Sequence, residues 1–271
     1  MRALACGFAL LVAVARSAAA QAIDAGISVG VVRLTDARSE QALTGILEYQ
    51  AGWFSLYAMP AALHVSSTTT TSKGGSVSTS TSGVGDLPLV AAASYTSRTP
   101  GAPTLGAALL VVLPTGNASC GLGNGQTAAG VDLGAAVSPG RAHLSADASR
   151  SVSGVSSQSA LNAPTATTLR LEAGYDAAPR WTWTASLGVD LGTADSTQAL
   201  SRVIGVGVSH TLSGALVLTV DGSRGLTSAS PQWVLTVGLG TAFGGSSPVT
   251  PTTPLRRIRA TFSTGGTSGC R

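Results

Sequence analysis

Side chains along much of this chain alternate, with a period of two residues, between apolar and polar or small. From Trp181 to Leu191 the odd-numbered residues are all apolar, and Thr, Ser, Gly and Asp stand between them. Successive side chains of a β-strand point to opposite faces of the sheet. A segment of this kind therefore predicts a strand with one face suited to lipid and the other suited to water.

Similar segments recur along the chain and are separated alternately by short turns and longer polar stretches. The predicted strands are 26–34, 41–50, 53–65, 84–98, 103–114, 126–138, 141–152, 166–177, 180–191, 200–211, 214–224 and 231–243. An even number of strands, with short turns on one side and longer loops on the other, is typical of bacterial outer-membrane barrels. We therefore expect an all-β fold, a transmembrane antiparallel up-and-down β-barrel of about 12 strands in the bacterial outer membrane. A soluble secreted β-sandwich is the alternative fold.

The composition agrees with residence in a membrane. Charged residues make up only 10% of the chain, against about 25% in a typical soluble domain. No basic stripe interleaved with aromatic residues is present, so we expect no nucleic-acid partner. Beyond the first twenty residues no apolar run is long enough for a transmembrane helix, and strands must therefore cross the bilayer.

Both ends of the chain differ from the alternating middle. Residues 1–20 have a positive start, an apolar core and a small-residue end at Ala18-Ala19-Ala20, which predicts a cleavable signal peptide. Residues 21–243 form the predicted barrel, and the Pro-, Thr-, Ser- and Gly-rich residues 244–271 are predicted to be a disordered tail. After cleavage Cys120 and Cys270 remain. The topology places them on opposite sides of the membrane, so we expect that they do not pair.

Aromatic residues gather at the predicted strand ends beside the short turns. They are Tyr49, Trp53, Tyr95, Tyr175, Trp181 and Phe243. Aromatic rings favour the interface between lipid and water, where barrels carry girdles of them. The alternative is ordinary core aromatics.

Charged side chains on the predicted inward faces are candidates for lining the lumen. They are Glu48, Asp132, His143, Asp147, Arg170, Glu172 and Asp190. Charge is costly on the lipid face, which places these groups inside. Arg170 with an acidic neighbour could form a selectivity ring, and the alternative is an ion-pair network that only stabilises the barrel. The Ser/Thr-rich stretch 66–83 is interpreted as a flexible outer loop and as the segment best placed to fold into the pore.

Catalysis is the least favoured interpretation of these residues. Ser145 and Asp147 share a face with His143, but residues two apart on a strand stand about 7 Å apart, too far for a nucleophile and its base. No Cys/His cluster has metal-ligand spacing. We therefore expect no enzymatic activity, no cofactor and no metal.

Three short motifs resemble a known family. Gly85-Asp86 stands at a predicted strand start, Pro114-Thr115-Gly116 at a strand end, and Gly121, Gly123 and Gly125 in the loop that follows. In this pattern the chain resembles an outer-membrane transporter family named for the meta-pathway of phenol degradation. The resemblance implies a barrel and a role in uptake of small aromatic or hydrophobic compounds.

These observations predict an outer-membrane channel for passive uptake of small solutes. Its expected partners are outer-membrane lipid, the barrel-assembly machinery and the solute. The alternative is a closed structural or surface-interaction barrel that displays Ser/Thr-rich loops, and a barrel hydrolase is the least favoured class.

Overall fold

A computed structural model describes residues 21–70, 74–96, 102–123, 125–153, 167–191, 200–213 and 216–243. The predicted signal peptide and tail lie outside these residues. Fourteen strands and one short 3₁₀ helix make up the described chain. They are β1 (Gln21–Thr35), β2 (Arg38–Ala51), β3 (Phe54–Ala58), β4 (Ala61–Thr70), β5 (Ser76–Val84), β6 (Leu87–Thr96), β7 (Thr104–Leu113), η1 (Ala118–Cys120), β8 (Ala128–Val137), β9 (Ala142–Ser153), β10 (Thr167–Ala178), β11 (Trp181–Leu191), β12 (Arg202–Ser213), β13 (Leu216–Gly225) and β14 (Trp233–Phe243).

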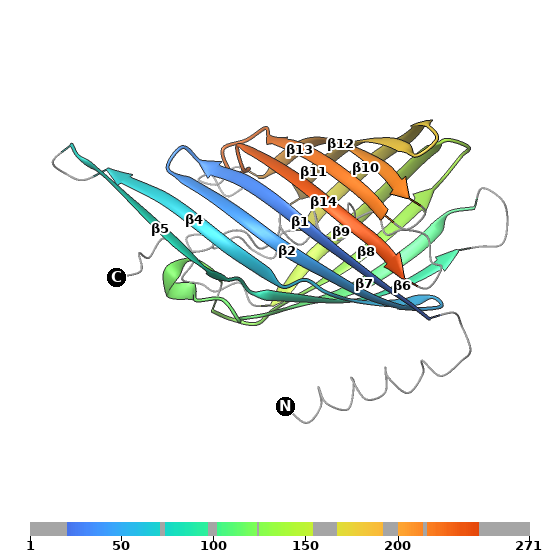
Figure 1. The fold of residues 1–271 in the computed structure, drawn as a ribbon, viewed down its shortest axis with the longest axis horizontal. Helices are drawn as coiled ribbons and strands as arrows, with labels where there is room; N and C mark the ends of the chain where they lie inside the picture. The colour runs from blue at the N-terminus through green and yellow to red at the C-terminus, as the bar shows by residue number, and fades with distance from the viewer. Residues whose placement is uncertain are drawn as a thin grey trace, which may run out of the picture.

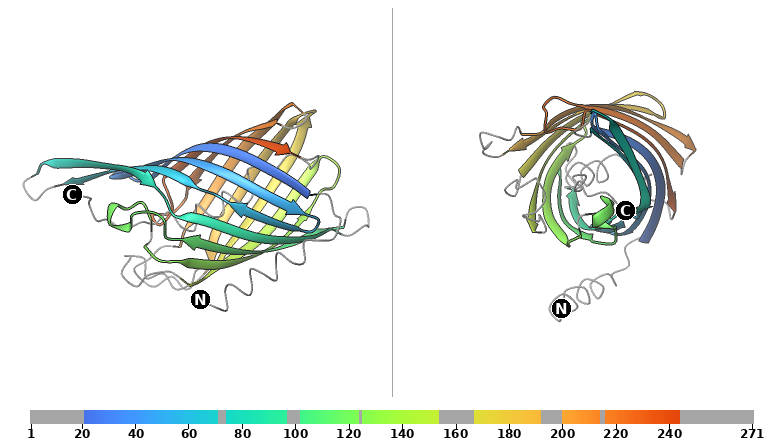
Figure 2. Two further views of the ribbon diagram at one scale, coloured as in Figure 1. Left: turned by 60° about the horizontal axis from the view of Figure 1, so that its bottom comes forward. Right: turned by 90° about the vertical axis from the view of Figure 1, so that its left-hand side faces the viewer.

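The strands form one closed antiparallel barrel (Figure 1). Closure takes place at β1, which pairs with β14 on one side and with β2 on the other. Ile27 lies opposite both Leu239 and Gly45. Closing the sheet removes the exposed edges that an open sheet would carry. The ring of strands is visible along the barrel in the right-hand view of Figure 2.

The fourteen strands correspond to twelve spans of the barrel wall. β3 and β4 are one span interrupted at Met59-Pro60, and β5 and β6 are one span interrupted at Gly85-Asp86. Backbone hydrogen bonds continue across the breaks, from Gly45 N to Pro60 O and from Gly85 N to Ala61 O. The predicted fold class and strand number are therefore confirmed.

The Ser/Thr-rich segment differs from the prediction. It is not a flexible loop, because β4 continues to Thr70 and β5 runs from Ser76 to Val84 in register with it. Hydroxyl groups face each other across the pair, as between Ser67 and Thr79, and Thr favours the extended backbone of a strand. The hairpin projects beyond the other strands, away from the lumen (Figure 1). A second predicted loop, 35–40, shortens to the turn Asp36-Ala37.

The two faces of the strands differ as the alternation predicted. Leu171, Leu187 and Ile204 lie side by side on neighbouring strands, since Leu187 is opposite the other two. All three are exposed, and they belong to a set of exposed apolar residues distributed around the barrel. In a membrane these apolar side chains contact lipid and not water, which is energetically favourable. The opposite face of each strand points into the barrel.

Exposed aromatic side chains mark one end of the barrel. Trp53, Tyr95, Tyr175 and Trp181 are 62%, 68%, 53% and 42% exposed beside the turns that join their strands. This end also holds the start of β1 and the end of β14, because Ile23 pairs with Phe243. Short turns are typical of the periplasmic side of outer-membrane barrels, so we call it the periplasmic end. The projecting hairpin and η1 lie at the opposite end, which we call the outer end. Within the described residues there is no helix with the length and apolar character needed to cross a membrane.

Candidate functional site

The seven predicted lumen residues all lie on the inward face of their strands. Glu48 is on β2, Asp132 on β8, His143 and Asp147 on β9, Arg170 and Glu172 on β10, and Asp190 on β11. In each case at least one neighbour in sequence is exposed, as Leu144 and Leu171 are. The role of the seven residues in a pore is taken up under "Proposed function".

The structure brings three of these residues together. The Arg170 guanidinium donates a hydrogen bond from Nη2 to Glu172 Oε2 at 3.0 Å. Asp147 lies directly opposite Arg170 on β9, and it is 5% exposed. One guanidinium thus stands among two carboxylates on the inner wall. A pair whose side chains are only 12% and 14% exposed is screened less than a surface pair.

His143 has partners other than those the sequence suggested. Its Nδ1 lies 3.1 Å from Ser138 Oγ, and its Nε2 lies 2.9 Å from Asp176 Oδ2. Asp176 also accepts a hydrogen bond from Thr182 Oγ1 at 2.7 Å. Ser138 belongs to the turn after β8, and Asp176 belongs to β10, the strand that pairs with β9. Sequence spacing could not identify this contact, which depends on the register between β9 and β10.

Glu48 belongs to a buried acidic pair that the sequence analysis did not recognise. Asp24 lies directly opposite Glu48 across β1 and β2, and the two are 2% and 5% exposed. Tyr57 and Ser55 hydrogen-bond the Glu48 carboxylate. Its Oε2 is nevertheless buried without a hydrogen-bond partner among the described residues. Asp24 was not among the predicted lumen residues because the first strand was predicted to begin at residue 26. Its acidic side chain, at a position that faces inward once the strand is extended, was a signal that could have identified it.

An apolar cluster adjoins Glu48 on the inner wall. Ile46, Met59 and Val90 are buried together, and Tyr57 and Leu110 pack against them. Leu110 and Val90 are opposite each other on β7 and β6. Tyr57 joins the cluster to the acidic pair, because it also hydrogen-bonds Glu48. Asp190 lies elsewhere on the wall and accepts a hydrogen bond from Thr168 Oγ1 at 2.8 Å.

The family-motif residues meet at the break between β5 and β6. Thr115 Oγ1 donates to Gly85 O at 2.7 Å, and Gly116 N donates to Asp86 Oδ1 at 3.0 Å. Gly123 lies so close to the Asp86 carboxylate that a Cβ there would collide with it. The loop after Pro114 is thereby fixed to the broken strand. We call residues 85–86 and 114–123 the motif unit.

Glycine is required at two further positions in this loop. Gly121 and Gly125 have φ of 70° and 68°, which side chains rarely adopt. Gly121 ends η1, whose start is capped by the Asn117 side chain accepting from Ser119 N. The motif unit therefore has a structural explanation, and it presents η1 at the outer end of the barrel (Figure 2).

Cys120, the last residue of η1, is disulfide-bonded. Its partner lies outside the described residues, where Cys6 and Cys270 are the other two cysteines of the chain. The expectation that Cys120 and Cys270 do not pair stays a prediction.

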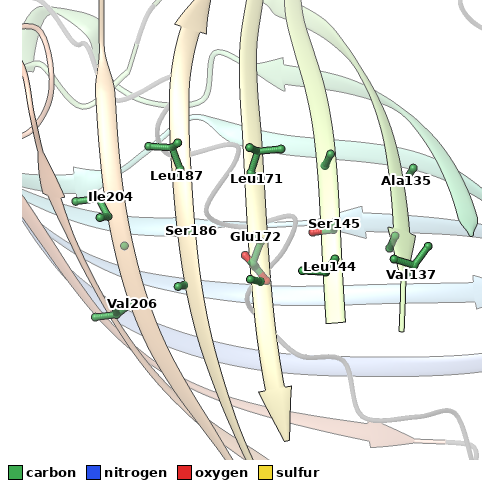
Figure 3. A pocket seen from close by; sticks show the side chains of 15 residues that line it. Ala135, Val137, Leu144, Ser145, Leu171, Glu172, Ser186, Leu187, Ile204 and Val206 are labelled. Atoms are coloured by element: carbon green, nitrogen blue, oxygen red, sulfur yellow. The ribbon is translucent and has the colours of Figure 1, made fainter. Parts of the chain in front are cut away.

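A shallow pocket of about 670 Å³ lies across β8 to β12 (Figure 3). Its apolar wall includes Leu144, Leu171, Leu187, Ile204 and Val206, which are 39% to 63% exposed. These residues share the face that carries the apolar belt, so the pocket is a depression of the outer surface. Its chemistry suits a lipid acyl chain and not a water-borne solute.

Comparison with known proteins supports the fold. No protein-family model matches the chain, and no curated protein matches it. Among solved structures, the COG4313 outer membrane channel from Pseudomonas putida F1 is similar, with a TM-score of 0.61 and 19% identity over 84% of this chain and 97% of that one. The KdgM porin is similar with a TM-score of 0.52 and 11% identity, over 82% of this chain and 99% of that one.

The NanC porin is similar at a TM-score of 0.50 and 9% identity, over 81% of this chain and 98% of that one. At these identities the likeness concerns the fold. The chain forms a closed twelve-span barrel with an apolar outer belt, and its fold is similar to those of outer-membrane channels and porins. This chain is therefore an outer-membrane β-barrel.

Proposed function

We propose that this protein is an outer-membrane channel through which small solutes, including aromatic or hydrophobic ones, diffuse passively. The observation that carries the proposal is the contrast between the two faces of one closed barrel. Apolar residues such as Leu187 and Val237 are exposed outside, whereas Glu48, Arg170 and Glu172 lie on the inner wall. Such a wall suits water and charge, as in channel-forming barrels.

The inner wall also supports the solute class. Tyr57 and Leu110 are only partly buried where they pack on the cluster of Ile46, Met59 and Val90, and they provide an apolar surface that an aromatic ring can contact. Passage without covalent chemistry needs only such weak contacts. Insertion would use the barrel-assembly machinery after removal of residues 1–20. The motifs around Asp86 and Gly116 support membership of the phenol meta-pathway family.

Recordings in planar bilayers test the proposal. Refolded protein of residues 21–271 is expected to give discrete conductance steps, and benzoate or phenol is expected to reduce the current by occupying the pore. Recordings are made with and without a thiol reductant and with a variant that ends at Phe243. A folded barrel that conducts in none of these states would contradict the channel proposal.

A surface-interaction barrel is the second candidate, and the projecting β4–β5 hairpin is the observation that favours it. Ser67, Thr68, Thr79 and Ser78 pair their hydroxyl groups across the hairpin, which provides a polar ribbon above the membrane. Deletion of residues 66–83 is expected to abolish binding of cells to a receptor or glycan array if this function holds, and to leave conductance intact.

Ester hydrolysis is the enzymatic alternative, and the contact of His143 with Ser138 and Asp176 makes it testable. We expect no hydrolysis of p-nitrophenyl esters above that of a Ser138→Ala control. The His143 and Asp176 side chains are 42% and 41% exposed, so His143→Ala should change the free energy of unfolding by less than about 1 kcal/mol. Activity that is lost in both variants would contradict the expectation and indicate a hydrolase.

A further inference from the structure

The pocket across β8 to β12 has a floor of small side chains. Ala173 on β10 is in register with Ala185 on β11, and both line the pocket. The next outward-facing pair toward the outer end is Leu171 with Leu187, and Figure 3 shows these two leucines side by side. Methyl groups next to the longer leucine side chains leave a hollow in the wall. The depression therefore follows from which residues the register brings together.

Bulky side chains close the hollow on its other sides. Toward the periplasmic end the next outward-facing pair is Tyr175 with Trp183, which are 53% and 57% exposed. Leu144 on β9 and Val206 on β12 lie directly beside the two alanines. The pocket is therefore bounded on four sides, unlike an open stripe of small residues.

The floor of the pocket lies at the depth of the acyl chains of the periplasmic leaflet. Trp181 starts β11, and its exposed ring marks the headgroup level, which aromatic rings favour. Ala185 lies about 13 Å further along the strand, at about 3.3 Å per residue. At the usual tilt of about 40° this corresponds to about 10 Å of depth, less than half of an apolar band of about 25 Å. A lipid with its headgroup at Trp181 thus extends its chain over the pocket.

The rim next to Trp181 has groups that suit a phosphate. Arg180 is exposed in the turn before β11, and a guanidinium binds phosphate through paired N–H donors. His210 Nδ1 donates to the carbonyl of Arg180 at 3.1 Å. The imidazole also stacks on the ring of Trp181, with centroids 4.1 Å apart. These contacts hold a histidine and a tryptophan beside Arg180 at the headgroup level.

A second arginine makes the rim positive. Arg141 is exposed just before β9, and its carbonyl accepts a hydrogen bond from Asp176 N at 2.8 Å. It stands two strands from Arg180, about 10 Å at the usual strand spacing. Asp176 is the acidic residue among the described residues of this rim, and its carboxylate accepts hydrogen bonds from Thr182 and His143. Two arginines thus stand against one carboxylate that is already hydrogen-bonded within the protein.

We infer that this pocket and its rim bind one anionic phospholipid of the periplasmic leaflet. An acyl chain lies over Ala173 and Ala185, and the phosphate contacts Arg180. The pocket is continuous with the lipid-facing belt, so in a membrane an acyl chain is what meets it. The positive rim favours a headgroup with net negative charge. Such a lipid binds whether or not the barrel conducts, so the site and the channel proposal can fail separately.

Native mass spectrometry of the refolded protein of residues 21–271 tests the site. The protein is mixed in detergent with equimolar phosphatidylglycerol and phosphatidylcholine that have the same acyl chains. One phosphatidylglycerol should be retained per barrel, with a preference over the zwitterionic lipid on the order of tenfold. Equal retention of the two lipids would overturn the inference, and so would a dimer of barrels without lipid, which would assign the pocket to a second copy.

Substitution of the rim tests the phosphate contact. Arg180→Gln removes the guanidinium and should lower the preference for phosphatidylglycerol on the order of threefold or more. The matched control is Arg202→Gln, because Arg202 is also exposed but lies at the other end of the barrel, at the start of β12. Equal effects of the two substitutions would show that the phosphate is not held at this rim.

Filling the floor tests the acyl-chain contact separately. The double variant Ala173→Leu and Ala185→Leu should reduce retention of both lipids, because the added side chains occupy the hollow. Ala107→Leu is the control, since Ala107 is exposed on β7 between the exposed Leu105 and Leu109 and does not line the pocket. Leucine suits the lipid face, so both variants should unfold thermally like the unaltered protein. Unchanged retention in the double variant would contradict the pocket as the chain's site, even if Arg180→Gln has its expected effect.

Discussion

Replacement of Leu187 with lysine is expected to lower the free energy of unfolding in lipid by about 2–4 kcal/mol, the cost of a basic side chain near the middle of the apolar belt. Leu187 is central in β11 and lies opposite Leu171 and Ile204. All three side chains are exposed, so a lysine here would have only hydrocarbon around its ammonium group. Urea unfolding in lipid vesicles, followed by tryptophan fluorescence, measures the effect.

The matched control is the neighbouring residue, Ser186→Lys. Ser186 points to the other face of the same strand and lies opposite Glu172, so a lysine can reach water and a carboxylate. Its cost should stay below about 1 kcal/mol, in line with the tolerance of lumen positions. A larger loss for Ser186→Lys than for Leu187→Lys would show that the faces are assigned the wrong way round.

The assignment of faces is also the part of the fold that could be predicted from sequence. Alternation between apolar and polar residues depends only on the geometry of a single strand. It therefore placed Asp147 and Glu172 inside and Leu171 outside before any pairing was known. In β10 and β11 the predicted and observed bounds agree within one residue, whereas β1 begins at Gln21, well before its predicted start at residue 26.

Contacts between strands could not be predicted in the same way. Asp176 meets His143 because Tyr175 is in register with Ala142, and a shift of one residue would separate them. The Ser/Thr-rich hairpin was misjudged for a related reason. Its residues lack apolar alternation, and the hydrogen bonds between β4 and β5 that order them depend on a register that the sequence does not reveal.

The glycines of the motif unit are a third case, in which the residues were recognised but their purpose was not. The sequence suggested a tight loop at Gly121, Gly123 and Gly125. In the structure the loop packs against the break between β5 and β6, and Leu122 in its middle is only 5% exposed. The need for glycine at 123 comes from the Asp86 carboxylate, far away in sequence, and the need at 116 comes from the backbone of Leu122 together with Asp86 N.

Gly116→Ala is the substitution that should disturb this packing most directly. A Cβ at position 116 would collide with the backbone carbonyl of Leu122 and approach Asp86 N to 3.1 Å. Backbone atoms cannot rotate away as a side chain could, so the loop must move and the hydrogen bond from Gly116 N to Asp86 weakens. Overpacking of this kind costs about 1–3 kcal/mol. Thermal unfolding in detergent measures the loss, and the yield of the Cys120 disulfide reports the displacement of η1.

Gly222→Ala is the control for the effect of replacing glycine with alanine at a position without a steric clash. A Cβ at Gly222 on β13 would meet nothing within 4 Å, so the methyl group is accommodated without any shift. Its effect should be neutral or slightly stabilising, because alanine restricts the unfolded chain more than glycine does. If Gly116→Ala and Gly222→Ala behave alike, the loop yields without cost, and the motif unit does not hold η1 and Cys120 at the barrel's outer end.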